Sequence, residues 1–348
     1  MTYTLDLRKL TIVKIISKTV RFKAAAAAVL ATALVLTGCS STGGAPRNTA
    51  GSEGGGTVDT PRLVVSMVSH GAPGDTFWDL VRKGAEDAAR KNNIELRYSA
   101  DPETPNQANL IQSAIDSQVD GLAVTMPNAD ALGPAAQRAV DAGIPVVGLN
   151  AGMERYAEFG LSGFFGQEEK IAGTRAGERL AEDGAEHVLC VIHEQGNSSQ
   201  EDRCAGVAEG AGGATEVESI YVNGMDLTSV QSTLQAKLSQ DTSIDWIMSL
   251  VAPVALTAAN SAEGANSEAK IATFDTNAQL VEAIRNDKVQ WAIDQQPYLQ
   301  GYLAIDAIWL AHRNGSTVGG GRPVFTGPSF VDATNVDQIA DAAQEGLR

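Results

Sequence analysis

The sequence has few basic residues, few cysteines and few histidines, and each shortage excludes a class of protein. Lys and Arg number 26 against 42 Asp and Glu, so the net charge is −16. Because binding to phosphate backbones needs a basic face, this balance argues against a nucleic-acid partner. The three Cys and four His are scattered, without the spacing of a zinc site. We therefore expect neither a bound metal nor a cofactor.

Motifs of nucleotide binding and nucleophilic catalysis are also missing. The sequence contains no GxxxxGK[ST] loop, no GxGxxG turn after a predicted strand and no GxSxG elbow. The one neighbouring His–acid pair, His193 and Glu194, does not differ from ordinary loop polarity. These absences predict that the protein is not an enzyme.

The N-terminus has the pattern of an export signal. A basic stretch, 1–23, precedes an apolar run, 24–36, and 13 residues are too few for a membrane span of about 20 residues. We therefore predict a signal peptide over 1–38.

The apolar run ends in Leu-Thr-Gly-Cys39, which resembles the bacterial lipobox. This resemblance implies lipidation of Cys39, and the alternative is ordinary signal cleavage that leaves Cys39 as an incidental thiol. Residues 39–60, rich in Gly, Ser and Thr, predict a flexible tether.

Two further cysteines are candidates for a disulfide. Cys190 lies late in a predicted strand, and Cys204 lies in the helix that follows. Outside the cytoplasm disulfides persist, and a bridge closing a loop of about 15 residues contributes roughly 3 kcal/mol. We predict this bridge, with two buried free thiols as the alternative.

The body of the chain alternates between apolar strands and amphipathic helices. Strands are expected at 63–69, 94–99, 121–125, 144–149, 187–192, 215–222, 244–251, 270–275, 289–294 and 322–331. Helices are expected at 75–92, 106–118, 129–143, 168–184, 199–212, 227–240, 253–264, 278–287 and 298–315. This order predicts an α/β protein of parallel sheets with helices on both faces. The strands are too many for one comfortable sheet, so we predict two doubly wound lobes.

Candidate binding residues follow from the rule that such sheets bind ligands at the carboxyl ends of their strands. Asp75, Phe77 and Trp78 come after the first strand. Aromatic rings stack on the apolar faces of sugars, whose hydroxyl groups need fixed hydrogen-bond partners. Packing in the core is the alternative for the two aromatics. Because neighbouring helix residues face different directions, we expect that both do not point into one core.

Polar residues also end several later strands. Asn150, Asp275 and Gln295 follow three strands, and Arg203 lies in the helix after another. Carboxylate, amide and guanidinium groups offer complementary donors and acceptors to hydroxyl groups. Four such residues that converge on one cleft are better evidence for a ligand-binding site than any one of them alone.

Residues 62–332 resemble the type I periplasmic binding proteins of the ribose-binding and related sugar-binding group. The matching segments are GDTFWDLVRKGAEDAA (74–89), VDGLAVTMPNADAL (119–132), GIPVVGLNAG (143–152), GQEEKIAG (166–173), GNSSQEDRCAGV (196–207), IATFDTNAQ (271–279) and DQQPYLQGY (294–302). The resemblance implies one lobe from 62–165 and 296–326, and a second from 166–295 and 327–348. A hinge of three strands is expected to cross near Gly166, Gln295 and Thr326-Gly327.

The family's ligand residues are partly kept. Its Arg, Asp and Gln fall on Arg203, Asp275 and Gln295, whereas other positions carry Asn150, Ala151, Met225 and Val251 in place of the family's residues. These departures argue against ribose as the ligand. The additional candidates are His70, Asn128, His193, Met225 and Asp226.

The family resemblance implies an extracytoplasmic protein, the lipobox-like segment implies a lipid anchor, and we expect a monomer. It would capture a monosaccharide or sugar alcohol and deliver it to the permease of an ABC importer. A receptor that reports an autoinducer-like or sugar signal to a membrane sensor is the alternative.

Overall fold

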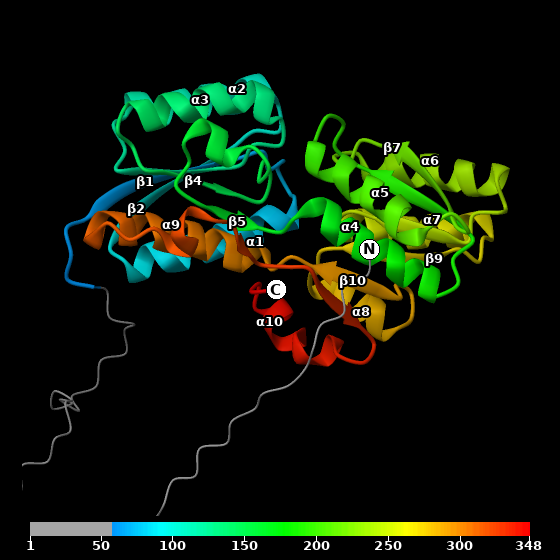
Figure 1. The fold of residues 1–348 in the computed structure, drawn as a ribbon. Helices are drawn as coiled ribbons and strands as arrows, with labels where there is room; N and C mark the ends of the chain where they lie inside the picture. The colour runs from blue at the N-terminus through cyan, green and yellow to red at the C-terminus, as the bar shows by residue number, and fades with distance from the viewer. Residues whose placement is uncertain (1–57) are drawn as a thin grey trace, which may run out of the picture. The chain divides into compact units, whose positions relative to one another are not determined.

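The computed structural model describes residues 58–348, which form two β-sheets, each flanked by helices (Figure 1). The predicted signal peptide, Cys39 and nearly all of the tether lie outside the described residues. Within 58–348, every helix is too short or too polar to cross a membrane.

The first sheet has six parallel strands in the order β11-β5-β4-β3-β1-β2. They are β1 (Leu63–Ser69), β2 (Ile94–Ala100), β3 (Gly121–Val124), β4 (Val146–Leu149), β5 (Phe164–Gly166) and β11 (Val324–Phe325). One face is covered by α1 (Thr76–Lys91) and α9 (Pro297–Asn314). The other is covered by α2 (Thr104–Asp116), α3 (Ala129–Asp141) and the short η1 (Tyr156–Phe159) (Figure 1). A further turn, η2 (Val318–Gly321), precedes β11.

The second sheet repeats this plan in the order β12-β10-β9-β8-β6-β7, with only β12 antiparallel. Its strands are β6 (His187–Ile192), β7 (Glu216–Tyr221), β8 (Trp246–Ser249), β9 (Lys270–Phe274), β10 (Trp291–Asp294) and β12 (Ser329–Asp332). On one face lie α4 (Glu169–Glu182) and α5 (Ser198–Ala211). On the other lie α6 (Leu227–Gln240), α7 (Ala252–Ala265), α8 (Ala278–Arg285), η3 (Val336–Gln338) and α10 (Ala340–Gln344).

The central strands are apolar on both sides because both faces are covered. In β6, Leu189 and Val191 pack into the cluster under α6 and α7, whereas Val188 and Ile192 pack into the cluster under α4 and α5. This alternation follows from the two-residue period of a strand. It explains why such strands are uninterrupted apolar runs in the sequence.

Three segments connect the lobes. The chain leaves the first sheet after β5, returns after β10 and crosses again between β11 and β12. The sequence predicted a single last strand over 322–331, and this is wrong. The segment is broken at Gly327–Pro328, because proline has no N–H for a sheet ladder. Its halves pair with different sheets, β11 with β5 and β12 with β10.

The predicted disulfide is confirmed. Cys190 in β6 is bonded to Cys204 in α5, with a Cα–Cα distance of 5.9 Å. Close packing of α4 on α5 accompanies the bridge. A Cβ atom at Gly173 of α4 would overlap the backbone carbonyl of Arg203, so glycine is required for this approach.

Candidate functional site

A small cavity of about 30 Å³ lies between the lobes, where the carboxyl ends of strands from both sheets meet. Its lining residues are His70, Asp75, Phe77, Trp78, Asn150, His193, Glu194, Asn197, Ser199, Gln200, Arg203, Leu250, Val251, Asp275 and Gln295. The seven main candidates from the sequence therefore share one cavity, together with His70 and His193.

The aromatic wall of the cavity comes from the start of α1. Trp78 meets the ring of Phe77 edge-on at 5.1 Å between centroids, and the ring of His70 at 4.7 Å. Both Phe77 and Trp78 belong to the apolar cluster under α1 and α9. The expectation that they do not share one core is therefore wrong. The two rings lie at the edge of the core that borders the cavity, so they belong both to the core and to the cavity wall.

Asp75 begins α1 and faces the same space. Its carboxylate caps the helix by accepting a hydrogen bond from the N–H of Phe77 at 3.0 Å. Burial raises the pKa of Asp75 to about 6, against the lowering effect of this hydrogen bond. Asp75 thus combines the capping role with a position in the cavity.

Arg203 is held by a carboxylate that sequence analysis did not find. Its Nε and Nη2 donate to the two oxygens of Glu169 at 2.6 and 3.0 Å, and Nη1 donates to the carbonyl of Leu250 at 3.4 Å. Burial opposes the charge, but Glu169, Asp275 and Glu194 together outweigh burial and raise the pKa of Arg203. Since guanidinium has five N–H groups, two have no partner among the described residues and can donate to a ligand.

A chain of amide and carboxyl groups joins the lobes at the floor of the cavity. Gln295 donates to Asp275 at 2.7 Å and accepts from Asn150 at 3.3 Å. Asn150 and Asp275 both have positive φ, 62° and 66°, at the ends of their strands. Burial raises the pKa of Asp275 to about 7, although Arg203 and Gln295 act in the opposite direction.

The two candidate histidines lie on opposite lobes around Glu194. Its Oε2 is 3.7 Å from His70 Nε2, and its Oε1 is 4.0 Å from His193 Nε2. Burial lowers the pKa of both histidines, to about 4 for His193. Burial of Glu194 would raise its pKa, but the histidines, Asn197 and Arg203 together lower it.

The remaining candidates lie away from the cavity. Asn128 caps α3, and Met225 is largely exposed; both line an adjoining groove between the lobes. Asp226 caps α6 by accepting from Ser229 N at 3.0 Å and borders neither space. A polar residue in a loop is often a helix cap, and the sequence alone does not separate the two roles.

Several lining residues were missed by sequence analysis. Glu194, Asn197, Ser199 and Gln200 follow the carboxyl end of β6. The strand-end rule that selected Asn150 would also have selected this loop. Glu169 had no such signal, because it acts through Arg203 from the start of a different helix.

Contacts across the cleft join the two lobes beside the cavity. The N–H and hydroxyl groups of Ser198 each donate to the carbonyl of Pro127 at 3.1 Å. On another side, Asn277 Nδ2 donates to Thr76 Oγ1 at 3.4 Å. Two facing lobes, joined by three crossing segments and with a polar cavity between them, define a hinged solute-binding protein.

The comparisons agree with this class. Residues 65–315 match the family model described as the periplasmic binding protein domain, and the chain belongs to this family. It is an extracytoplasmic solute-binding protein.

A carbohydrate transporter from Acidothermus cellulolyticus, solved with myo-inositol, is 50% identical over 83% of this chain and 100% of that chain, with a TM-score of 0.81. A xylitol-binding protein of Mycolicibacterium smegmatis is 30% identical over 43% of this chain and 42% of its own length. A xylose/arabinose-binding protein of Sulfolobus acidocaldarius is 23% identical over 86% of this chain and 78% of its own length.

Proposed function

We propose that this chain captures a small polyhydroxylated solute, a sugar, sugar alcohol or cyclitol, and presents it to the permease of an ABC importer. One observation carries the proposal: an aromatic wall and a set of charged and amide groups line the same cavity between the two lobes. A cavity of this kind suits a compact molecule with an apolar face and a rim of hydroxyl groups.

Each group has a role in this proposal. Trp78 packs against the apolar face of the ligand. The two remaining N–H groups of Arg203 donate to ligand oxygens, and Asp275 accepts from ligand hydroxyl groups. Gln295, which contacts both Asp275 and Asn150, ties ligand binding to the contact between the lobes.

The named ligands of the similar proteins support this class of solute. Myo-inositol, xylitol, xylose and arabinose are all rich in hydroxyl groups and uncharged. Myo-inositol is the first candidate, because the protein solved with it shares half of its aligned residues with this chain. Asn150 and Val251, where the family pattern differs, both line the cavity and support a solute other than ribose.

The proposal includes the lobe boundaries and the anchor. The first lobe comprises 62–165 with 296–326, and the second comprises 166–295 with 327–348. The signal peptide over 1–38, lipidation of Cys39 and the tether over 39–60 would hold the protein at the outer face of the cell membrane, as a monomer.

Calorimetry with myo-inositol, xylitol, xylose, arabinose and ribose tests the proposal. At least one of the first four compounds is expected to bind tightly with one site per chain. Trp78→Ala and Asp275→Ala are each expected to weaken binding about 30-fold or more, as for central contacts worth 2 kcal/mol.

Phe325→Ala is a matched aromatic control, because Phe325 is exposed and borders no part of the cavity. Binding should be unchanged in this variant. If both cavity variants keep the parent affinity while remaining folded, the proposed site is wrong. Absence of binding by every polyol and sugar would contradict the proposed solute class.

A further inference from the structure

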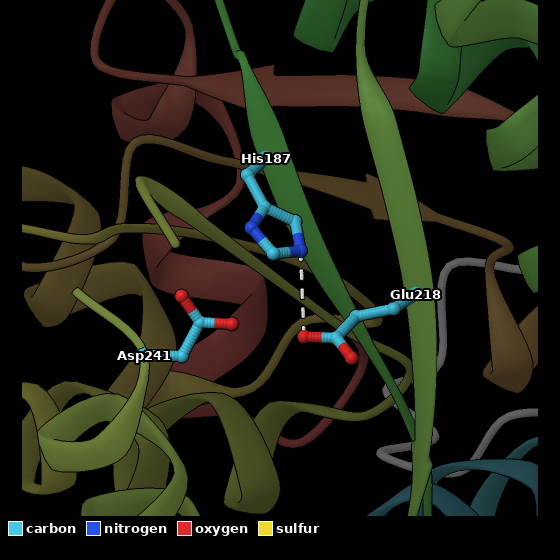
Figure 2. Close-up of side chains that lie close together, drawn as sticks. All are labelled: His187, Glu218 and Asp241. Atoms are coloured by element: carbon cyan, nitrogen blue, oxygen red, sulfur yellow. Dashed lines mark ion pairs between the residues drawn. The ribbon is translucent and has the colours of Figure 1, made fainter. Parts of the chain in front are cut away.

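A second cluster of polar side chains lies at the end of the second lobe opposite the cavity. His187 is the first residue of β6, Glu218 lies in β7 and Asp241 follows α6 (Figure 2). One nitrogen or oxygen from each of the three lies within 4.8 Å of the others. The cavity is at the carboxyl ends of the same strands, so this cluster is a separate feature.

Hydrogen bonding determines which nitrogen of the neutral His187 ring carries the proton. The hydroxyl group of Ser243 donates its only proton to Asp241 Oδ1 at 2.6 Å. Ser243 Oγ must therefore accept from His187 Nδ1, which lies 2.8 Å away. The proton of the neutral ring is on Nδ1, and Nε2 presents a lone pair.

That lone pair faces another acceptor. His187 Nε2 is buried without a hydrogen-bond partner among residues 58–348 and lies 3.4 Å from Glu218 Oε1, which also contacts Lys237 Nζ at 2.7 Å. Two acceptors at this distance repel each other unless a proton or a metal ion joins them, and a proton on Nε2 makes the contact an ion pair (Figure 2). The imidazole itself is more than nine-tenths buried, so water does not easily relieve the conflict.

The geometry suits a transition-metal ion. Ligand atoms about 2.1 Å from a tetrahedral zinc ion lie about 3.4 Å from each other, which is the observed separation of Nε2 and Oε1. A metal-binding histidine usually donates a hydrogen bond from the ring nitrogen that does not bind the metal. Here His187 Nδ1 donates to Ser243. Imidazole also favours zinc over calcium or magnesium.

Charge around the cluster is unbalanced in favour of a cation. Glu216 lies 4.0 Å from His187 Nε2 and adds a third carboxylate. Among residues 58–348, the ammonium group of Lys237 is the cation paired with these carboxylates, at 2.7 Å from Glu218 and 3.3 Å from Asp241. Lys237 is partly exposed at the end of a flexible stem, so it can turn to solvent when a divalent ion enters.

We propose that His187, Glu218 and Asp241 form a binding site for a divalent transition-metal ion such as Zn²⁺, with Lys237 as an internal competitor. The ion would join the amino ends of β6 and β7 to the end of α6. It would therefore stabilise the second lobe and leave the ligand cavity unchanged.

Calorimetric titration of the untagged, chelator-treated protein with Zn²⁺ tests this proposal. One ion per chain is expected to bind and to raise the melting temperature. His187→Gln should weaken zinc binding about 100-fold or more, since even outer-shell changes cost 10- to 100-fold. Lys237→Gln should strengthen it about tenfold, because a competing positive charge is removed. His312→Gln is the matched control and should bind as the parent does.

Equal zinc affinity of the parent and His187→Gln would overturn the proposal, as would weaker binding by Lys237→Gln. Loss of zinc binding in His193→Gln, with His187→Gln unaffected, would place the ion in the ligand cavity and also overturn it. Glu218→Gln applies the same test if His187→Gln does not fold. Binding of a polyol is measured separately in each variant, so the outcome does not depend on the proposed transport function.

Discussion

At the scale of single residues, the most informative group in the cavity is the carboxyl of Asp275. It is fully buried and its pKa is raised to about 7, chiefly by burial. In the proposed binding mode, a ligand hydroxyl group donates to the ionised carboxylate, so binding would favour loss of the proton. Asp275 would thereby couple ligand capture to pH near neutrality.

We expect ligand affinity to increase as pH rises from 5 to 8, and Asp275→Asn to weaken binding about tenfold or more and flatten this pH dependence. Calorimetry in buffers of different ionisation enthalpy measures the proton released on binding.

The stability of the ligand-free protein should change in the opposite direction and decrease as pH rises. Because the folded pKa of Asp275 exceeds the unfolded value near 4, its contribution to stability is present below pH 4 and is lost as pH rises through 7.

The stability of Asp275→Asn relative to the parent should therefore increase from pH 4 to above pH 7 in denaturant titrations. Asp226→Asn serves as the control, since Asp226 is an exposed helix cap outside the cavity. A constant difference between Asp275→Asn and the parent across this range would contradict the raised pKa.

At the scale of elements, the contact between α4 and α5 determines where Arg203 lies. The ion pair with Glu169 joins the two helices, and Gly173 lets them approach closely beside it. Gly173→Ala is expected to destabilise the protein by about 1–3 kcal/mol, as overpacking does. Because the helices must separate, it should also weaken ligand binding by shifting Arg203.

Denaturant unfolding and calorimetry measure both effects. Gly213→Ala is the matched control, because a Cβ atom there meets no neighbour within 4 Å. It should change neither quantity appreciably. Unchanged ligand affinity in a destabilised Gly173→Ala would show that the helix contact does not position Arg203.

Helices and strands were easier to predict from the sequence than the contacts between distant residues. The strands and helices were predictable because apolar runs and helical periods are local patterns. The strand-end rule found Asn150, Asp275 and Gln295, since parallel strands bring their carboxyl ends to one edge. Glu169 and the break at Gly327–Pro328 depend on which segments meet in space, and a local pattern does not contain this information.

At the scale of the whole molecule, the proposed anchor sets where the protein works. Cys39→Ala is expected to move the protein from the membrane fraction to the soluble fraction, because acyl chains supply most of the attachment. Fractionation and immunoblotting measure this change. Ligand binding by the released protein should equal that of the parent, since the substitution leaves every residue that lines the cavity unchanged. A variant that still sediments with membranes would contradict lipidation.

The position of the disulfide has a consequence for the order of maturation. Cys204 is the neighbour of Arg203 in the sequence, and its bond to Cys190 fastens α5 to β6 within one lobe. The bridge does not cross the cleft, so oxidation does not hinder opening and closing of the lobes. This bond forms in an oxidising compartment. The segment of α5 that carries Arg203 is therefore fastened to β6 only after the protein has left the cytoplasm.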